Sequence, residues 1–204
     1  MNRAELKQAA KDSLKGKYGQ AILVMIIFGL ISGAASGIIT GIFGTESETG
    51  PMVSSLVSVV ISCLFVPGYT SFFMKIARNE NVEYSELFSK IKLFVPYLLI
   101  TLLTGIFVCL WSLLFIIPGI IAAYGYSLVT YILLDNPEMG AMDVLRKSKE
   151  MMNGHKMDLF VLHLSFIGWA ILGMLTCGIL YLWLTPYMTV TEIKFYEALK
   201  AQNN

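Results

Sequence analysis

The chain has 204 residues, of which 56% are hydrophobic and 14% are charged, and its mean hydropathy is +0.68. A soluble domain carries about 25% charged residues, so a membrane solvent explains this composition best. The net charge of +1 favours neither a nucleic acid nor an acidic partner, and it leaves the positions of the charges as the informative feature.

Residues 1–18 are predicted to form a cytoplasmic interfacial helix. Its basic residues recur at every fourth position and share one stripe: Arg3, Lys7, Lys11 and Lys15. Apolar residues recur at helical spacing on another side: Leu6, Ala10 and Leu14. This pattern suits a helix on an anionic inner leaflet. No small-residue cleavage pattern follows, so we interpret the next segment as a first membrane anchor rather than a removed signal peptide.

Two long apolar runs come next, and each is long enough to cross a hydrocarbon core of about 30 Å as a helix. The first span is predicted near 19–43 and the second near 52–77. An acidic, turn-rich loop at 44–51 separates them. Pro67 and Gly68 lie within the second run.

The first span carries four glycines at four-residue intervals: Gly29, Gly33, Gly37 and Gly41. Such a spacing places a smooth groove on one helix face, which lets another helix approach closely. The pattern does not distinguish packing within the chain from dimerisation, and we favour packing within the chain. We therefore expect Gly33→Leu to displace a neighbouring helix and Val24→Leu to be tolerated on a lipid-facing side.

The polar stretch 78–92 returns to an interfacial pattern, and residues 93–134 are then apolar and uncharged. This second stretch is long enough for two spans. The turn between them is predicted near Gly105, near Ser112 or at Pro118-Gly119, and periodicity does not choose among the three positions.

Asp135 precedes Asn136 and Pro137, which is the pattern of a helix N-terminus with a side-chain cap and proline in the first turn. We favour this capping role over the alternative, in which the Asp135 charge is held inside the bundle. The following cytoplasmic helix carries a basic cluster: Arg146, Lys147 and Lys149. Two further spans are predicted near 159–175 and 178–197.

The distribution of Lys and Arg predicts the orientation, because cytoplasmic loops are enriched in these residues. The 15 basic residues fall into four groups: five before the first span, four between Lys75 and Lys92, four between Arg146 and Lys156, and two at Lys194 and Lys200. The three connections on the other side contain none. We therefore predict an all-α transmembrane helical bundle that forms a single domain, 1–204, with about six spans and both termini in the cytoplasm.

The same layout resembles a threefold repeat of interfacial helix, span, tight outer turn and proline-containing span. Each unit has one proline after an apolar run: Pro67, Pro118 and Pro186. The alternative explanation is that Pro and Gly are common in membrane helices.

Several ordered segments carry a family resemblance: Pro118 to Ile121, Tyr131 to Pro137, Ser148, Met151 to Lys156, Leu159 to Leu162, Leu164 to Trp169 and Pro186-Tyr187. Together with Glu5 to Lys7 and Leu14 to Gly16, they resemble the bacterial membrane family of domain of unknown function 975. The resemblance covers nearly the whole chain. It implies a polytopic inner-membrane protein of a bacterium and supplies no catalytic residues.

Three ionisable residues in or beside the spans are candidates for a functional site. His163 is either a buried proton-handling group or a neutral imidazole bonded to a neighbouring helix. Glu192 either lines a polar cavity or stands at the headgroup level, which we favour. Asp135 has the two interpretations given above. The chain contains no metalloprotease, nucleophile-elbow or phosphate-loop motif, so we expect no enzyme, metal or cofactor.

These features favour a non-enzymatic membrane protein, which is a scaffold, an accessory subunit or a protector of the envelope. We expect its partners to be anionic lipids of the inner leaflet and other membrane proteins. The candidate headgroup ligands are the seven basic residues named above on residues 1–18 and 146–149. A small transporter or channel with proline-broken helices is the alternative. A cavity lined by Pro118, His163 and Pro186 would favour that alternative.

Overall fold

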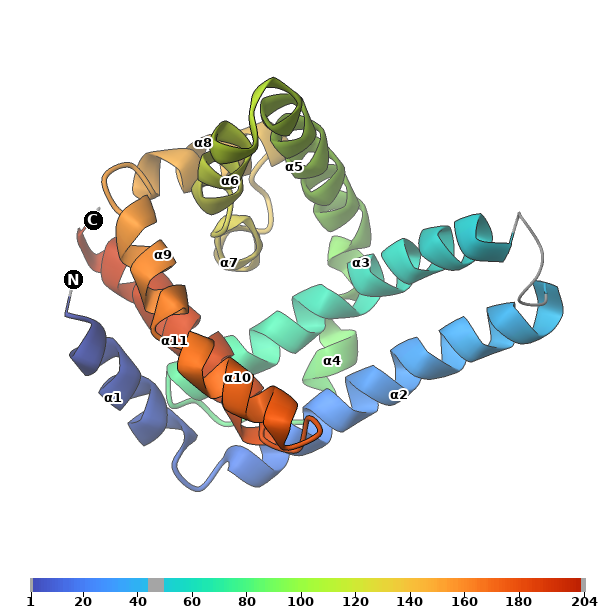
Figure 1. Ribbon diagram of the computed structural model, residues 1–204, viewed down its shortest axis with the longest axis horizontal. Helices are drawn as coiled ribbons and strands as arrows, with labels where there is room; N and C mark the ends of the chain where they lie inside the picture. Colours follow the sequence, from blue (N-terminus) through green and yellow to red (C-terminus); the bar gives the residue numbers. More distant parts are fainter. Residues whose placement is uncertain (1, 44–49, 203–204) are drawn as a thin grey trace.

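A computed structural model describes residues 2–43 and 50–202 (Figure 1). Helices make up 83% of it and the described residues contain no strand, so the predicted all-α class is confirmed. The elements are α1 Arg3–Leu14, α2 Tyr18–Phe43, α3 Gly50–Ala77, α4 Glu86–Ser89, the short 3-10 helix η1 Ile91–Leu93, α5 Phe94–Leu114, α6 Ile116–Gly125, α7 Val129–Asp135, α8 Ala141–Met151, α9 Lys156–Leu164, α10 Ile167–Leu175 and α11 Tyr181–Gln202. Most of the predicted acidic loop at 44–51 lies outside the described residues.

Five helical segments of the described part are long and apolar enough to cross a membrane: Tyr18–Ile38, Pro51–Ala77, Glu86–Leu114, Ile116–Asp135 and Lys156–Leu175. The predicted sixth span, 178–197, corresponds to α11. Its second half carries Glu192, Lys194 and Glu197, which gives this helix a more polar character. The chain is therefore a polytopic membrane protein with five apolar segments and one additional, partly polar helix.

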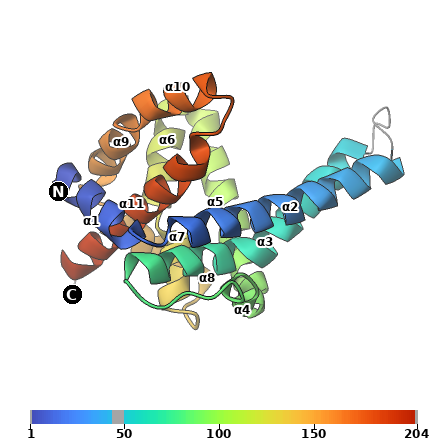
Figure 2. The ribbon, with the colours of Figure 1, turned by 90° about the horizontal axis from the view of Figure 1, so that it is seen from below.

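The helices follow one another as three hairpins, in which α2 packs on α3, α5 on α6, and α10 on α11. A short helix precedes each hairpin along the chain. These helices are α1 before α2, α4 before α5, and α8 before α9 and α10. Figures 1 and 2 show that the α2–α3 hairpin projects away from the rest of the chain. This order agrees with the predicted arrangement of units, while a common origin of the units stays a prediction.

The buried core lies where the other ends of the hairpins meet. It includes Phe72 and Phe73 of α3, Ile132 of α7, Phe166 and Tyr196, all with at most 2% of their surface exposed. The hairpin tips, by contrast, are apolar and open. Leu113 to Ile117 at the α5–α6 turn are 64–78% exposed. Such surfaces are costly in water, so lipid is the environment that this part of the fold requires.

The turn between the third and fourth spans lies at Phe115, whose backbone is extended (φ −159°, ψ 150°) between α5 and α6. This position falls between two of the three predicted sites, Ser112 and Pro118-Gly119. Gly119 allows the tight return, because a Cβ at this residue would lie 2.0 Å from the Ser112 hydroxyl. Pro118 occupies the first turn of α6, where its missing N–H has no helical partner.

The second hairpin is anchored to the first through α4. A Cβ at Gly68 would lie 2.1 Å from the Leu87 carbonyl oxygen, so only glycine permits this approach of α3 to the α4 backbone. The buried Glu86 carboxylate accepts hydrogen bonds from Ser71 (2.7 Å) and Lys75 (2.6 Å) of α3. A close backbone contact and an ion pair therefore hold α4 in one place.

The four-glycine face of α2 does not pack within the chain, so our preferred interpretation of it is wrong. A Cβ built at Gly29, Gly33, Gly37 or Gly41 meets no atom within 4 Å. Val24→Leu was expected to be tolerated if that position faces lipid, but Val24 is fully buried. The physical reason is that α3 and the core approach α2 from the Val24 side, which leaves the glycines on the open side.

The first helix is shorter than predicted and its apolar face is covered by protein. Leu6, Ala10 and Leu14 are buried, because α1 packs on α11 and α3. The Ser13 hydroxyl donates to the Ala77 carbonyl oxygen (3.3 Å) at the end of α3. The apolar side of α1 is therefore not the surface that would insert into a leaflet.

The predicted fifth span, 159–175, is interrupted. It consists of α9 and α10, and Ser165 and Phe166 lie between them in a turn. The Ser165 hydroxyl donates to the Leu162 carbonyl oxygen (2.5 Å), which satisfies one backbone acceptor at the end of α9.

Candidate functional site

His163 and Glu192, which the sequence singles out separately, contact each other. The His163 Nε2 atom lies 3.0 Å from a Glu192 carboxylate oxygen, and His163 Nδ1 lies 3.2 Å from the Tyr124 hydroxyl. Tyr131 donates to the other Glu192 oxygen at 3.4 Å. We call these four residues the His163 cluster. It joins α6, α7, α9 and α11.

The His163 and Glu192 side chains are each about one third exposed, at 33% and 34%. Glu192 therefore turns to its protein partners, which favours the interior interpretation over the headgroup position that we preferred. His163 matches the interpretation in which the imidazole bonds to neighbouring helices. Its hydrogen-bonded chain of two hydroxyls, an imidazole and a carboxylate can hold a proton at several atoms.

A second group of polar residues surrounds Asp135, whose side chain is only 9% exposed. Its carboxylate accepts hydrogen bonds from Arg78 (2.8 Å), Tyr196 (2.9 Å) and Lys200 (2.5 Å). Glu197 in turn accepts two hydrogen bonds from Arg78, at 2.6 and 2.8 Å. We call these five residues the Asp135 cluster. It ties the end of α3, the end of α7 and the C-terminal part of α11 together.

The capping role that we favoured for Asp135 is wrong. Asp135 is the last residue of α7, and α8 begins only at Ala141, with Gly140 at its N-cap position. The Asn136 side chain donates back to the Ile132 carbonyl oxygen (3.0 Å) and so belongs to the end of α7. The alternative is correct, because the nearby cations outweigh a local cap as partners for a buried carboxylate.

The predicted lipid-facing lysines of α1 divide into two kinds. The Lys7 ammonium lies 4.0 Å from the centre of the Phe166 ring, and that of Lys11 lies 5.6 Å from the centre of the Tyr187 ring. Burial lowers the pKa of Lys7, and the neighbouring Lys11 and Arg3 lower it further. These two lysines hold α1 on the aromatic side of α10 and α11. Lys11 is also exposed, as are Arg3 and Lys15.

The three basic residues of α8 are exposed, as expected for one polar face of an amphipathic helix. Arg146 lies 3.5 Å from Asp143, one turn earlier. Lys149 lines a cavity between α5, α6 and α8, to which Lys156 also contributes. The described residues contain no group of three or more His, Cys, Asp or Glu side chains that could hold a metal ion.

The sequence model of one protein family, described as "Protein of unknown function (DUF975)", matches residues 1–125 and 113–203. The chain belongs to this family. No curated protein and no solved structure matches the chain. The predicted resemblance is thus confirmed for nearly the entire length of this DUF975 member.

Sequence reasoning missed most partners in the two clusters of this DUF975 protein. Arg78 was counted with the cytoplasmic basic residues, although it neutralises Asp135. Tyr196 and Lys200 stand four residues apart on one face of α11, and this spacing could have indicated a shared partner. Tyr124 and Tyr131 gave no such signal, because tyrosines in membrane helices are commonly interfacial belt residues without a specific partner.

Proposed function

We propose that this protein is a non-enzymatic membrane protein that holds anionic lipids of the cytoplasmic leaflet and presents apolar hairpins to lipid or other membrane proteins. One observation carries the proposal: charge and apolar surface are separated along the chain. The segments 18–74, 93–145 and 157–193 contain no Lys or Arg. Exposed basic residues stand at the short helices that precede or separate these segments, among them Arg3 and Lys15 at the two ends of α1 and Lys147 on α8.

Two further features support this role over transport or catalysis. The cavity that contains Pro118 is lined by neither His163 nor Pro186, so the arrangement that would favour a transporter is not met there. The Asp135 cluster has its charges paired across three helical segments, which suits a structural lock. On this proposal the His163 cluster also serves to join helices.

The proposed location is the inner or plasma membrane of a bacterium, with both termini in the cytoplasm. In a background without native cysteines, Glu138→Cys should react with an impermeant thiol reagent only after permeabilisation. Glu46→Cys, in the predicted outer loop, should react in intact cells, because the basic segments stay inside. Labelling of Glu46→Cys only after permeabilisation would refute this orientation.

Lipid retention tests the proposed function. We expect the purified protein to enrich anionic over zwitterionic lipid at about 0.1 M salt, and to lose most of this enrichment at about 1 M, because the screening length falls from about 10 Å to about 3 Å. The triple variant Arg3→Gln, Lys15→Gln and Lys147→Gln should reduce enrichment about fivefold or more at the lower salt, since each surface cation contributes about 1 kcal/mol.

A matched control is the exposed acidic residue Glu138, since Glu138→Gln also changes one surface charge but leaves the cations intact. This variant should retain as much anionic lipid as the wild type. Equal retention by wild type and triple variant at both salt concentrations would contradict the proposed function.

A further inference from the structure

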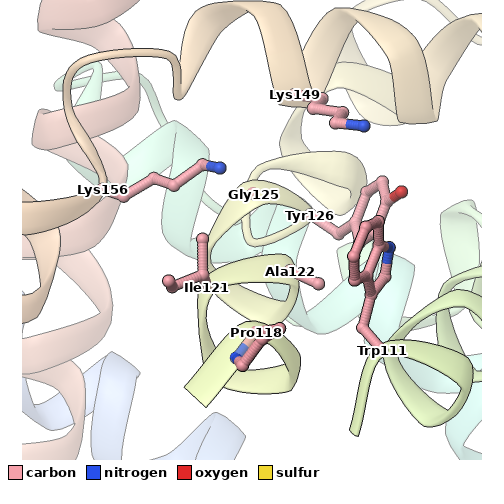
Figure 3. A pocket seen from close by; sticks show the side chains of 8 residues that line it. All are labelled: Trp111, Pro118, Ile121, Ala122, Gly125, Tyr126, Lys149 and Lys156. Carbon is pink, nitrogen blue, oxygen red and sulfur yellow. The ribbon is translucent and has the colours of Figure 1, made fainter. Parts of the chain in front are cut away.

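A cavity of about 330 Å³ lies between α5, α6, α8 and the start of α9 (Figure 3). We call it the Trp111 cavity. Its lining consists of Trp111, Pro118, Ile121, Ala122, Gly125, Tyr126, Lys149 and Lys156. Its volume is at the lower end of the range of about 300–1,000 Å³ for ligand sites, and its lining combines apolar walls with a few polar groups.

The two kinds of lining residue occupy different ends. In Figure 3 the amines of Lys149 and Lys156 lie on one side, while Pro118, Ile121 and Trp111 form the opposite wall. The apolar wall continues toward the exposed tip at Phe115, which is 72% exposed. The cavity therefore has a cationic end and an apolar end, which is the polarity of an anionic amphiphile.

The two lysines lack a carboxylate partner in the described part of the chain. Two acidic residues of the same segments are engaged elsewhere, because Asp143 pairs with Arg146 (3.5 Å) and Asp158 with His155 (3.0 Å), while in the described residues Glu150 forms no ion pair with either lysine. Two like charges at one cavity repel each other, and an anion between them removes this repulsion. The charge of the cavity thus fits a negatively charged ligand.

The fold holds this cavity open in a defined way. Ser148 is fully buried, and its hydroxyl donates to the Gly125 carbonyl oxygen (2.9 Å) and accepts from the Leu128 N–H (3.3 Å). These bonds fix α8, and with it Lys149, beside the end of α6. Gly125 lies beside the Lys156 stem, since a Cβ there would be in ordinary van der Waals contact with Lys156 Cε, at 3.5 Å.

A second cavity of about 310 Å³ shares Trp111, Tyr126 and Lys149 with the first one. Arg146 and Leu145 of α8 contribute to its lining. Open space beside these two aromatic rings therefore extends beyond the first cavity, with Lys149 common to both. This extension favours a ligand with hydrocarbon chains over a small anion, which would use the lysines alone.

We propose that the Trp111 cavity binds one anionic phospholipid, with its phosphate between Lys149 and Lys156 and an acyl chain along Trp111, Pro118 and Ile121. This inference rests on the proposed function, since both assign anionic lipid as the ligand. It adds a defined site and names Lys156 as a ligand, which the sequence analysis did not select. It also moves the lipid from the exposed face of α8 to a cavity behind it.

Tryptophan fluorescence tests this site directly. The variant Trp169→Phe with Trp183→Phe keeps Trp111 as its one tryptophan, and both replaced residues are about half exposed, at 52% and 48%. The protein is reconstituted in phosphatidylcholine vesicles that contain a small fraction of lipid brominated on its acyl chains. Bromine quenches a tryptophan that it contacts. Brominated phosphatidylglycerol should half-quench Trp111 at about a tenfold lower mole fraction than brominated phosphatidylcholine.

Two charge-matched pairs of substitutions locate the effect. Lys149→Gln with Lys156→Gln should remove the preference for phosphatidylglycerol. Lys17→Gln with Lys92→Gln removes two cations that neither line the cavity nor belong to the basic residues assigned to lipid above, and should leave the preference unchanged. The same loss in both pairs would show a general surface effect and would overturn the site.

Two outcomes need no further variant and so hold even where a substitution impairs folding. Equal quenching of Trp111 by the two brominated lipids in the parent protein would overturn the proposal. Loss of the preference on adding inorganic phosphate, at constant ionic strength, would show that a free phosphate occupies the lysines instead. The proposed function fails separately, because its test measures retention through Arg3, Lys15 and Lys147, none of which lines this cavity.

Discussion

Among the Gly→Ala substitutions in this protein, Gly68→Ala is expected to cause the largest loss of stability. The new Cβ would lie 2.1 Å from the Leu87 carbonyl oxygen, 2.6 Å from the Leu87 carbonyl carbon and 2.8 Å from the Glu86 carbonyl oxygen. All three are backbone atoms, which cannot move aside as a flexible side chain can. Overpacking a core costs about 1–3 kcal/mol, occasionally more. Because the clash is with backbone, we expect a loss of about 3 kcal/mol or more.

The displacement would also break an ion pair. If α4 moves away from α3, the Glu86 carboxylate loses its contacts with Ser71 (2.7 Å) and Lys75 (2.6 Å). The measurement is the midpoint of thermal unfolding in mild detergent. Gly33→Ala is the matched control, because a Cβ at Gly33 meets no atom within 4 Å and alanine favours helix. Equal midpoints for the two variants would contradict the close approach of α3 to α4.

The glycines show what the sequence could and could not predict. Four glycines at four-residue spacing define a helix face, and periodicity locates that face correctly on α2. It does not say which side of α2 the rest of the chain covers, because this depends on how the hairpins meet. Gly68 and Gly119, where an added Cβ would come closest to other atoms, stand beside prolines and have no repeating pattern. Their role depends on which parts of the chain lie against them. Gly68 contacts the α4 backbone, and Gly119 contacts Ser112 across the turn between α5 and α6.

The helical class, the apolar segments and their approximate bounds were predictable, since they depend on local hydropathy over windows of about 20 residues. The polar clusters were not. Asp135 precedes Asn136 and Pro137, and this local pattern favours a cap. Its actual partners, Arg78 and Lys200, are 57 and 65 residues away in sequence. Only the packing of α3, α7 and α11 around one point brings them together.

The second large effect is expected for Asp135→Ala. The change leaves the Arg78 guanidinium, the Lys200 ammonium and the Tyr196 hydroxyl without their common acceptor. Removing one partner of a buried ion pair costs about 3–5 kcal/mol. The Arg78 and Lys200 side chains are 31% and 39% exposed, so water can solvate part of the unpaired charge. We therefore expect the free energy of unfolding to fall by about 2 kcal/mol, measured by thermal unfolding.

Asp143→Ala is the matched control, because its pair with Arg146 is exposed (62% and 69%) and contributes about 0–1 kcal/mol. Asp135→Asn keeps the volume of the side chain and an acceptor for Tyr196, so its midpoint should fall between those of the wild type and Asp135→Ala. Equal midpoints for Asp135→Ala and Asp143→Ala would refute the structural lock.

A double variant separates the lock from simple loss of packing. If Asp135 and Arg78 stabilise the fold mainly through each other, adding Arg78→Ala to Asp135→Ala removes a cation that has already lost this partner. The stability lost on adding Arg78→Ala to Asp135→Ala should then be smaller than the stability lost in Arg78→Ala alone. Some loss should remain, because Arg78 also donates to Glu197 at 2.6 Å. Strictly additive losses would mean that the two residues act independently. In that case the end of α3 and the end of α7 are held together by their apolar neighbours, and the charges between them contribute little.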